Sequence, residues 1–308
     1  MQSLEKSHAP EGIGSKALDA EVFTSKDNRA VSEAAPADPE ISLIKVVSAN
    51  QFATIIPDSG LPNYQNPFVR LTGVTPKLGN VLLNLFESRS YPARITFRGK
   101  NGIIELKMPT TFHGGVIEWI IEQTFKWRLS SQLTDAESQD LCRGGNPTIT
   151  MTHGNYTDDR KVPDFTMQPR AQLPDIIPTV SMEVGWAQSY ASLQDNAVLL
   201  LEGGGPIAQR CILVHFTKGR NMVQCELEMW GKNGAGRALC IDTWDIFPAP
   251  APNTPQAAKP DPFLLRSEIF GQYVHPGQNP TDQLPLNLDR LRIISTAYIL
   301  AQGLVPRS

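Results

Sequence analysis

The sequence lacks both a hydrophobic run long enough to cross a membrane and an excess of basic residues. No apolar run reaches the ~18–20 residues of a membrane span, and the opening MQSLEKSHAPEG lacks the apolar segment of a secretory signal. Lys and Arg number 28 against 31 Asp and Glu, a formal net charge of −3. Because phosphate neutralisation drives binding to long nucleic acids, the overall charge does not support a nucleic-acid partner. We expect an intracellular protein, cytoplasmic or nuclear, without a membrane partner.

Cysteine is scarce, and several common catalytic motifs are missing. The four cysteines show no CxxC or Cys/His spacing, so we interpret them as reduced thiols rather than zinc ligands or disulfides. The histidines show no HxH or HExxH pattern, and no GxSxG elbow is present. The run GGGP (203–206) follows a predicted helix instead of joining a strand to a helix, so we interpret it as a turn and not a phosphate-binding loop.

Changes in composition divide the chain into four parts. Residues 1–40 are polar without apolar periodicity, which predicts a disordered or loosely attached tail. Residues 41–246 are expected to hold the main domain with an N-terminal extension. Residues 247–302 begin as a proline-rich linker and end in LDRLRIISTAYILAQ, which predicts a short amphipathic helix in a C-terminal extension. The final GLVPRS (303–308) resembles the remnant of a thrombin-cleavage tag.

The middle of the chain shows the periodicities of an α/β domain. Residues 94–109 predict two strands around a turn at Gly102, and the apolar spacing over 112–129 predicts a helix. Further predicted elements are strands at 147–153, 164–168 and 179–186, a helix over 187–204, and strands at 211–216 and 222–230. This order favours a mixed central sheet with a helix on each side.

One predicted strand carries an acidic residue among apolar ones. In TVSMEVGW the alternation places Val180, Met182 and Val184 on one face and Glu183 on the other. Asp164 stands at the start of the preceding strand, so pairing of the two strands would bring the carboxylates together. Two like charges that close are unfavourable unless a cation or a shared proton relieves them.

A hard cation is one solution for such an acidic pair. Mg²⁺ takes carboxylate and carbonyl oxygens, and it can activate water and stabilise charge at a phosphoryl group. Glu118 or Glu122, on the first predicted helix, is a candidate third ligand. A purely structural interpretation is also open, in which Asp164 caps the turn after Pro163 and Glu183 pairs with an arginine on a solvated sheet face.

The segment from Asp164 through SMEVGW to the following helix and apolar strand resembles the PD-(D/E)XK nuclease superfamily. It is similar in particular to a group of fungal proteins with a PD…P…EVG(W/Y)xxS core, over residues 95–231. The resemblance implies a restriction-endonuclease-like core of four strands flanked by helices, with Mg²⁺-dependent hydrolysis of phosphodiester bonds in active members. It implies Asp164, Glu183 and the Val184 carbonyl as metal ligands, with Glu118 as a further site residue.

The sequence departs from the family pattern at one position. The family's lysine, two residues after the acid, is replaced by Gly185. Losing one preorganised donor at such a site typically costs about 3–4 kcal/mol of barrier. Lys161 and Lys218 are candidates for a migrated lysine, and Gln188 is a candidate neutral donor. We therefore expect either a divergent metal-dependent nuclease or a nuclease-fold protein reused without nuclease activity. The second would be a binding or regulatory module, or an enzyme acting on a small metabolite.

Overall fold

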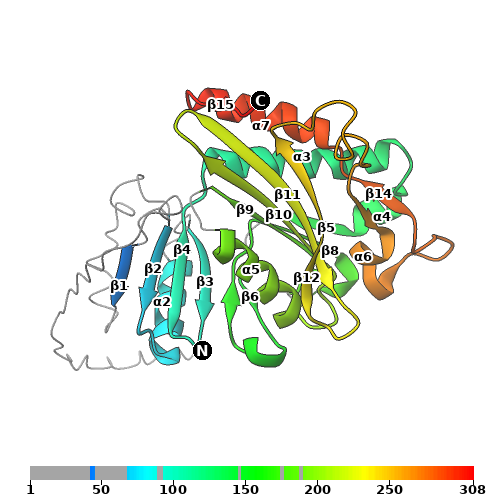
Figure 1. The fold of residues 1–308 in the computed structure, drawn as a ribbon. Helices are drawn as coiled ribbons and strands as arrows, with labels where there is room; N and C mark the ends of the chain where they lie inside the picture. Colours follow the sequence, from blue (N-terminus) through cyan, green and yellow to red (C-terminus); the bar gives the residue numbers. More distant parts are fainter. Residues whose placement is uncertain (1–41, 46–67, 89–92, 145–146, 174–176, 187–189) are drawn as a thin grey trace, which may run out of the picture.

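The computed structural model consists of two main β-sheets with helices packed on them (Figure 1). It describes residues 42–45, 68–88, 93–144, 147–173, 177–186 and 190–308. The chain is mixed α/β, as the sequence predicted. The predicted tail, residues 1–40, lies outside the described residues. Within the described part, no helix is long and apolar enough to cross a membrane.

The first sheet has the strand order β1-β2-β4-β3-β7-β6. Strands β3 and β4 form the predicted hairpin, in which Arg94 pairs with Lys107. Gly102 in its turn has φ +61°, a conformation that favours glycine. Helix α2 (Pro76–Ser88) buries Leu82 and Phe86 against this sheet. The strands are β1 (Ser42–Lys45), β2 (Phe68–Thr72), β3 (Arg94–Arg98), β4 (Ile103–Lys107), β6 (Ile149–Thr150) and β7 (Arg160–Lys161).

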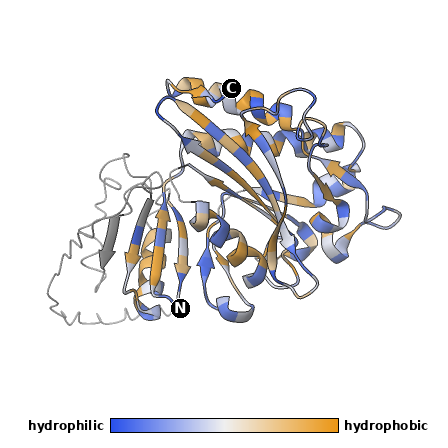
Figure 2. Cartoon of the chain, viewed as in Figure 1, coloured by the Kyte–Doolittle hydropathy of each residue, from blue (hydrophilic) through white to orange (hydrophobic). Residues whose placement is uncertain are grey.

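The second sheet has the strand order β12-β11-β10-β9-β8-β5, with β15 paired to β11. It is mixed, because β9 and β10 are parallel while the other neighbours along this path are antiparallel. Polar and apolar residues alternate along most of β11 (Figure 2), but buried and more exposed side chains alternate only as far as Leu227, because residues 227–231 are all buried. The strands are β5 (Leu141–Gly144), β8 (Phe165–Pro169), β9 (Val180–Gly185), β10 (Arg210–Lys218), β11 (Met222–Lys232), β12 (Ala238–Phe247) and β15 (Val305–Pro306).

The two faces of the second sheet are covered by different helices. Met182 and Val184 belong to a core cluster with residues of α3 (Thr111–Leu129). Residues of α5 (Tyr190–Gly203) pack on the other face, in a cluster that includes Leu213. Because side chains alternate along β9, Glu183 points to the α5 face, as the alternation predicted. Glu183 therefore lies on the side of the sheet away from the cluster that α3 forms with Met182 and Val184.

The C-terminal segment is part of the core and not an appended extension. Helix α7 (Leu288–Ala301) is the predicted helix, and it lies alongside α3 (Figure 1). Leu264, Phe270 and Leu291 are fully buried in the same cluster as the sheet residues. The remaining elements are α4 (Asp135–Asp140), β13 (Phe263–Leu265), α6 (Arg266–Phe270), β14 (Gln283–Pro285) and the short 3₁₀ segments η1 (Gly154–Tyr156), η2 (Arg170–Gln172) and η3 (Gly271–Tyr273).

Two sequence expectations need correction. The strand predicted over 147–153 is limited to β6, two residues long. The proline-rich segment does not act as an extended linker, because Lys259 and Pro260 fold back onto β12. The Lys259 ammonium contacts Asp242 and the Thr243 carbonyl, and the Trp244 indole donates to the Pro260 carbonyl at 3.0 Å. Residues 303–308 also join the fold, since Val305 and Pro306 pair with β11.

Candidate functional site

Strand pairing brings the two predicted carboxylates together. Strands β8 and β9 are antiparallel, with Phe165 opposite Met182. Asp164 and Glu183 each stand one residue beyond this pair, at the same end of the paired segment. Both side chains have no exposed surface. The predicted convergence of the two acids is therefore present, and it lies in the interior of the molecule.

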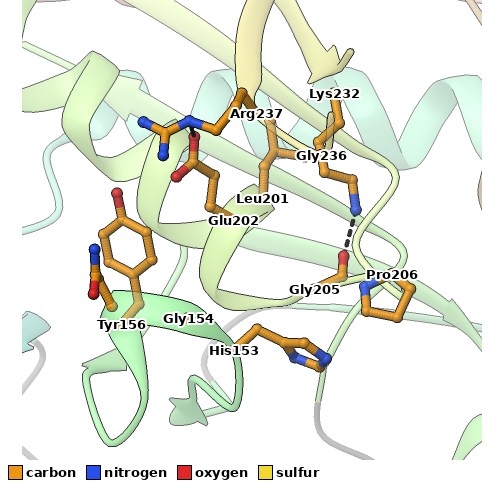
Figure 3. Close-up of a pocket in the computed structure, with 11 residues that line it drawn as sticks. His153, Gly154, Tyr156, Leu201, Glu202, Gly205, Pro206, Lys232, Gly236 and Arg237 are labelled. Carbon is orange, nitrogen blue, oxygen red and sulfur yellow. Dashed lines mark hydrogen bonds and ion pairs between the residues drawn. The ribbon is translucent and has the colours of Figure 1, made fainter. Parts of the chain in front are cut away.

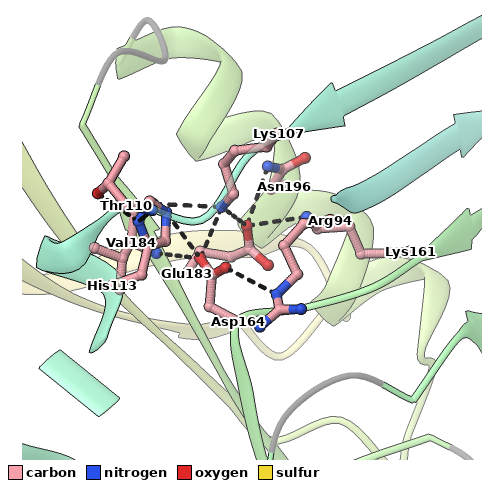
Figure 4. A network of polar contacts seen from close by, with 9 residues as sticks. All are labelled: Arg94, Lys107, Thr110, His113, Lys161, Asp164, Glu183, Val184 and Asn196. Carbon is pink, nitrogen blue, oxygen red and sulfur yellow. Dashed lines mark hydrogen bonds and ion pairs between the residues drawn. The ribbon is translucent and has the colours of Figure 1, made fainter. Parts of the chain in front are cut away.

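The positive charges that neutralise this pair come from the first sheet (Figure 4). The Lys107 ammonium, at the end of β4, lies 2.7 Å from Asp164 Oδ2 and 3.1 Å from Glu183 Oε2. Lys161 of β7 places its ammonium 3.0 Å from the same Glu183 oxygen. Arg94, the first residue of β3, has Nε 3.5 Å from Asp164 Oδ1. Three cations of one sheet thus meet two carboxylates of the other, and we call these five residues the junction cluster.

Neutral groups hold the carboxylates in place. The Val184 backbone N–H donates to Asp164 Oδ2 at 2.8 Å, and this bond ties the loop before β8 to β9. The Asn196 amide, from α5, donates to Glu183 Oε2 at 3.3 Å. Hydrogen bonds that favour the ionised form and the nearby cations both act to keep Asp164 charged. The pKa of Asp164 is accordingly held well below its ordinary range: burial alone would raise it, but Lys107 and the other cations outweigh burial.

His113, in the first turn of α3, faces the junction cluster. Its Nε2 lies 3.9 Å from Asp164 Oδ2, and its Nδ1 accepts from the Thr110 backbone N–H at 2.9 Å. Burial lowers the pKa of His113 to about 4, even though Asp164 opposes the shift. The imidazole is therefore neutral at physiological pH and adds no fourth positive charge to the cluster.

Hydrogen bonding within the cluster is incomplete although every residue is charged or polar. Three buried polar atoms of the cluster have no hydrogen-bond partner, namely Arg94 Nε, Asp164 Oδ1 and Glu183 Oε1, and the same holds for two atoms beside it, His113 Nε2 and Asn196 Oδ1. Buried polar atoms nearly always have a hydrogen-bond partner, so a concentration of atoms without one distinguishes this place from ordinary core. This concentration makes the junction cluster the strongest functional candidate in the described part of the chain.

The metal ligands that the resemblance implies surround a protein ammonium group. Lys107 Nζ lies 2.7 Å from Asp164 Oδ2, 3.1 Å from Glu183 Oε2 and 3.3 Å from the Val184 carbonyl. A Mg²⁺ ion binding the same oxygens at roughly 2.0–2.1 Å would overlap this nitrogen. In the arrangement observed, the residues therefore do not fit a divalent ion. Among the described residues, moreover, no group of three or more His, Cys, Asp or Glu side chains is arranged to hold a metal.

The residues of the cluster alone carry the functional interpretation of this chain. No family model matches the chain, and no curated protein does.

Of the residues proposed from the sequence, the structure brings together Asp164, Glu183 and the Val184 carbonyl. It also brings in Lys161, one of the two candidates for a migrated lysine.

Other residues proposed from the sequence lie elsewhere. Glu118 is exposed on α3 and accepts from the Tyr298 hydroxyl at 3.1 Å, so it does not join the cluster. Glu122 pairs with Arg290 at 2.6 Å. Lys218 is exposed at the end of β10. Gln188 lies outside the described residues.

Sequence reasoning missed Lys107, Arg94 and Asn196. The alternation in IIELK places Lys107 on the face of β4 opposite the apolar residues. This pattern could have predicted that the Lys107 side chain lies outside the apolar core of the first sheet. No signal in the sequence indicated that the first hairpin would meet the strand carrying Glu183. That meeting depends on how the two sheets pack, and packing of this kind has no local sequence pattern.

A second polar hollow, of about 550 Å³, lies at the C-terminal end of α5 (Figure 3). Its charged groups are already paired with the protein. The Lys232 ammonium donates to the Gly205 carbonyl, and Arg237 Nε lies 3.1 Å from Glu202 Oε1. Unlike the junction cluster, this hollow presents mainly satisfied groups, so it is the weaker candidate.

Proposed function

We propose that this chain is a restriction-endonuclease-like protein that works without metal-dependent nuclease activity, as a binding or regulatory module. The fold supports the first part of this proposal. Strands β5, β8, β9 and β10 are consecutive neighbours in the second sheet, with α3 and α5 on opposite faces. This arrangement agrees with the four-stranded, helix-flanked core that the sequence resemblance implies.

The second part of the proposal is the lack of metal-dependent nuclease activity. It is supported by the protein cations that surround the acidic pair. Asp164 and Glu183 are fully buried and are neutralised by Lys107, Lys161 and Arg94. A catalytic carboxylate that binds a metal and a phosphodiester has to reach both, whereas these carboxylates contact protein cations. The acidic pair therefore acts as an internal anchor between the two sheets, and recognition of a partner falls to other surfaces.

Metal-dependent phosphodiester hydrolysis is the second candidate, because one specific observation favours it. The three oxygens implied as ligands converge on a single point, and Lys161 contacts Glu183 as a migrated lysine would. In this candidate, Lys107 would have to leave its position before a Mg²⁺ ion bound. Nucleic acid would then be the partner, whereas the first candidate includes a small-molecule ligand among its partners.

A cleavage assay separates the two candidates. The full chain is incubated with single- and double-stranded DNA and with RNA, in Mg²⁺ or Mn²⁺, beside the variants Asp164→Asn and Glu183→Gln. We expect no cleavage by the wild type above the level of either variant. Asp135→Asn is the matched control, because Asp135 is a largely exposed carboxylate paired with Arg128 at 2.8 Å. Cleavage that both cluster variants lose and the control variant keeps would instead establish the nuclease candidate.

A further inference from the structure

Lys107 has the coordination of a bound cation and not that of a typical surface lysine. An ammonium group has three N–H donors and no acceptor. The three partners of Lys107 Nζ, at 2.7, 3.1 and 3.3 Å, are Asp164 Oδ2, Glu183 Oε2 and the Val184 carbonyl. Its hydrogen-bonding capacity is therefore used completely by the same three oxygens that the resemblance assigns to a metal.

The surroundings of Lys107 favour its charged form. Only 8% of its side chain is exposed, and its partners have none of their side-chain surface exposed. Two carboxylates lie within 3.1 Å of the ammonium, and opposite charges this close in the interior attract strongly. The backbone fixes the position as well, since Lys107 ends β4 and pairs with Arg94 on β3.

We propose that Lys107 is the permanent cation of this site and excludes divalent ions from it. Two physical effects carry the inference. The first is overlap, because a divalent ion on these oxygens would need the volume of the ammonium. The second is repulsion: the five charged side chains already sum to one excess positive charge, and the interior screens an added ion poorly. This inference deepens the proposed function, because it names the residue that replaces the metal.

A lysine and a metal differ in a way that matters to the protein. A bound ion exchanges with solvent and is removed by chelators, whereas Lys107 is covalently part of the first sheet. Cation and carboxylates therefore belong to different sheets, and the same contacts that neutralise Asp164 also hold β4 against β9. The junction is then independent of metal supply, and EDTA should leave the unfolding temperature of the wild type unchanged.

The test measures Mn²⁺ binding to the full chain by electron paramagnetic resonance and calorimetry. The variants are Lys107→Met, which keeps the length of the side chain without its charge, and the double variant Lys107→Met/Lys161→Met. We expect no saturable Mn²⁺ site in the wild type, a weak site in the single variant, and binding at least about tenfold tighter in the double variant, because each removal takes away a repelling charge. Adding Asp164→Asn should abolish the new site.

Folding of each variant is checked first by circular dichroism. If Lys107→Met does not fold, Lys107→Gln retains hydrogen-bond donors and serves in its place. A saturable Mn²⁺ site in the wild type that Asp164→Asn removes would overturn the inference. Folded Lys107 variants that bind Mn²⁺ no better than the wild type would also overturn it. Because these outcomes are read from binding, they stay distinct from the cleavage assay: a chain that neither binds Mn²⁺ nor cuts nucleic acid contradicts neither proposal.

Discussion

Two buried lysines contact the same oxygen of Glu183, yet their pKa values move in opposite directions. Burial lowers the pKa of Lys161, and the neighbouring Lys107 charge lowers it further; Glu183 does not compensate fully. Lys107 has two carboxylates within contact distance, and its pKa rises despite burial. Of the two lysines, Lys161 therefore gives up its proton more easily. Lys107 is the cation on which the cluster depends.

His113 predicts a specific dependence of stability on pH. Its pKa falls from 6.5 to about 4 on folding, so the unfolded chain binds the proton more tightly than the native protein. The stabilisation is fully present above pH 6.5 and is lost as the pH falls toward 4. Between about pH 7 and pH 5 the loss amounts to about 2 kcal/mol. Urea unfolding of the wild type and of His113→Asn at both pH values measures it.

Comparing the wild type with His113→Asn separates the effect of His113 on stability from that of the other groups that titrate. Asn retains an oxygen that accepts from the Thr110 N–H, so the start of α3 keeps its hydrogen bond. Asp164, the carboxylate nearest to His113, titrates only at lower pH because its pKa is lowered, and Lys107 stays charged because its pKa is raised. We expect the variant to lose about 2 kcal/mol less than the wild type between these pH values. Equal losses in the two proteins would show that His113 does not carry the effect.

Elements with a regular periodicity were predicted well from the sequence. Helix α3 and strand β9 lie where their apolar spacing predicted them. Their burial follows the pattern only in part, because Phe125 and Leu129 of α3 are exposed and all six residues of β9 are buried. Glu183 was placed on the correct face by the alternation of side chains along the strand. The short strand β6 was predicted too long, because two residues of pairing leave no measurable period.

The C-terminal segment shows why the rest could not be predicted. Leu264, Phe270 and Leu284 are fully buried, but they stand apart in the sequence between prolines and polar residues. Each is buried by contact with distant parts of the chain, and such contacts leave no local signature. Lys107 belongs to the same class, because its partners lie 57 and 76 residues away. Long-range packing therefore limited the prediction of both the fold and the site.

Helix α7 offers a direct test that the C-terminal segment is part of the core. Leu291 is fully buried in the cluster that joins α7 to α3 and the sheet, whereas Ile293 on the same helix is 60% exposed. Leu291→Ala should lower the free energy of unfolding by about 2–5 kcal/mol, because it removes buried methyl groups and leaves a cavity. Ile293→Ala, the matched control, should change it by no more than about 0.5 kcal/mol. Chemical denaturation measures both, and similar small effects would place α7 outside the cooperative core.

At the scale of the whole molecule, charge is divided between the two sheets. The first sheet contributes Arg94, Lys107 and Lys161, and the second contributes Glu183 and the adjoining Asp164. Neither set is balanced alone, so separating the sheets would leave buried charges without partners. Breaking a buried ion pair by removing one member typically costs about 3–5 kcal/mol. The junction cluster should therefore couple the opening of the first sheet to the stability of the second.

Amide hydrogen exchange tests this coupling between the sheets. In Asp164→Asn, three cations face one carboxylate, and we expect the first sheet to open more often. Amides of β3 and β4 should then exchange at least about a hundredfold faster, while those of β10 and β11, inside the second sheet, should change much less. Asp135→Asn removes a largely exposed carboxylate and should leave both sets unchanged. Equal acceleration in both sheets would show that they unfold as one unit, and no acceleration in β3 and β4 would show that the cluster does not hold the sheets together.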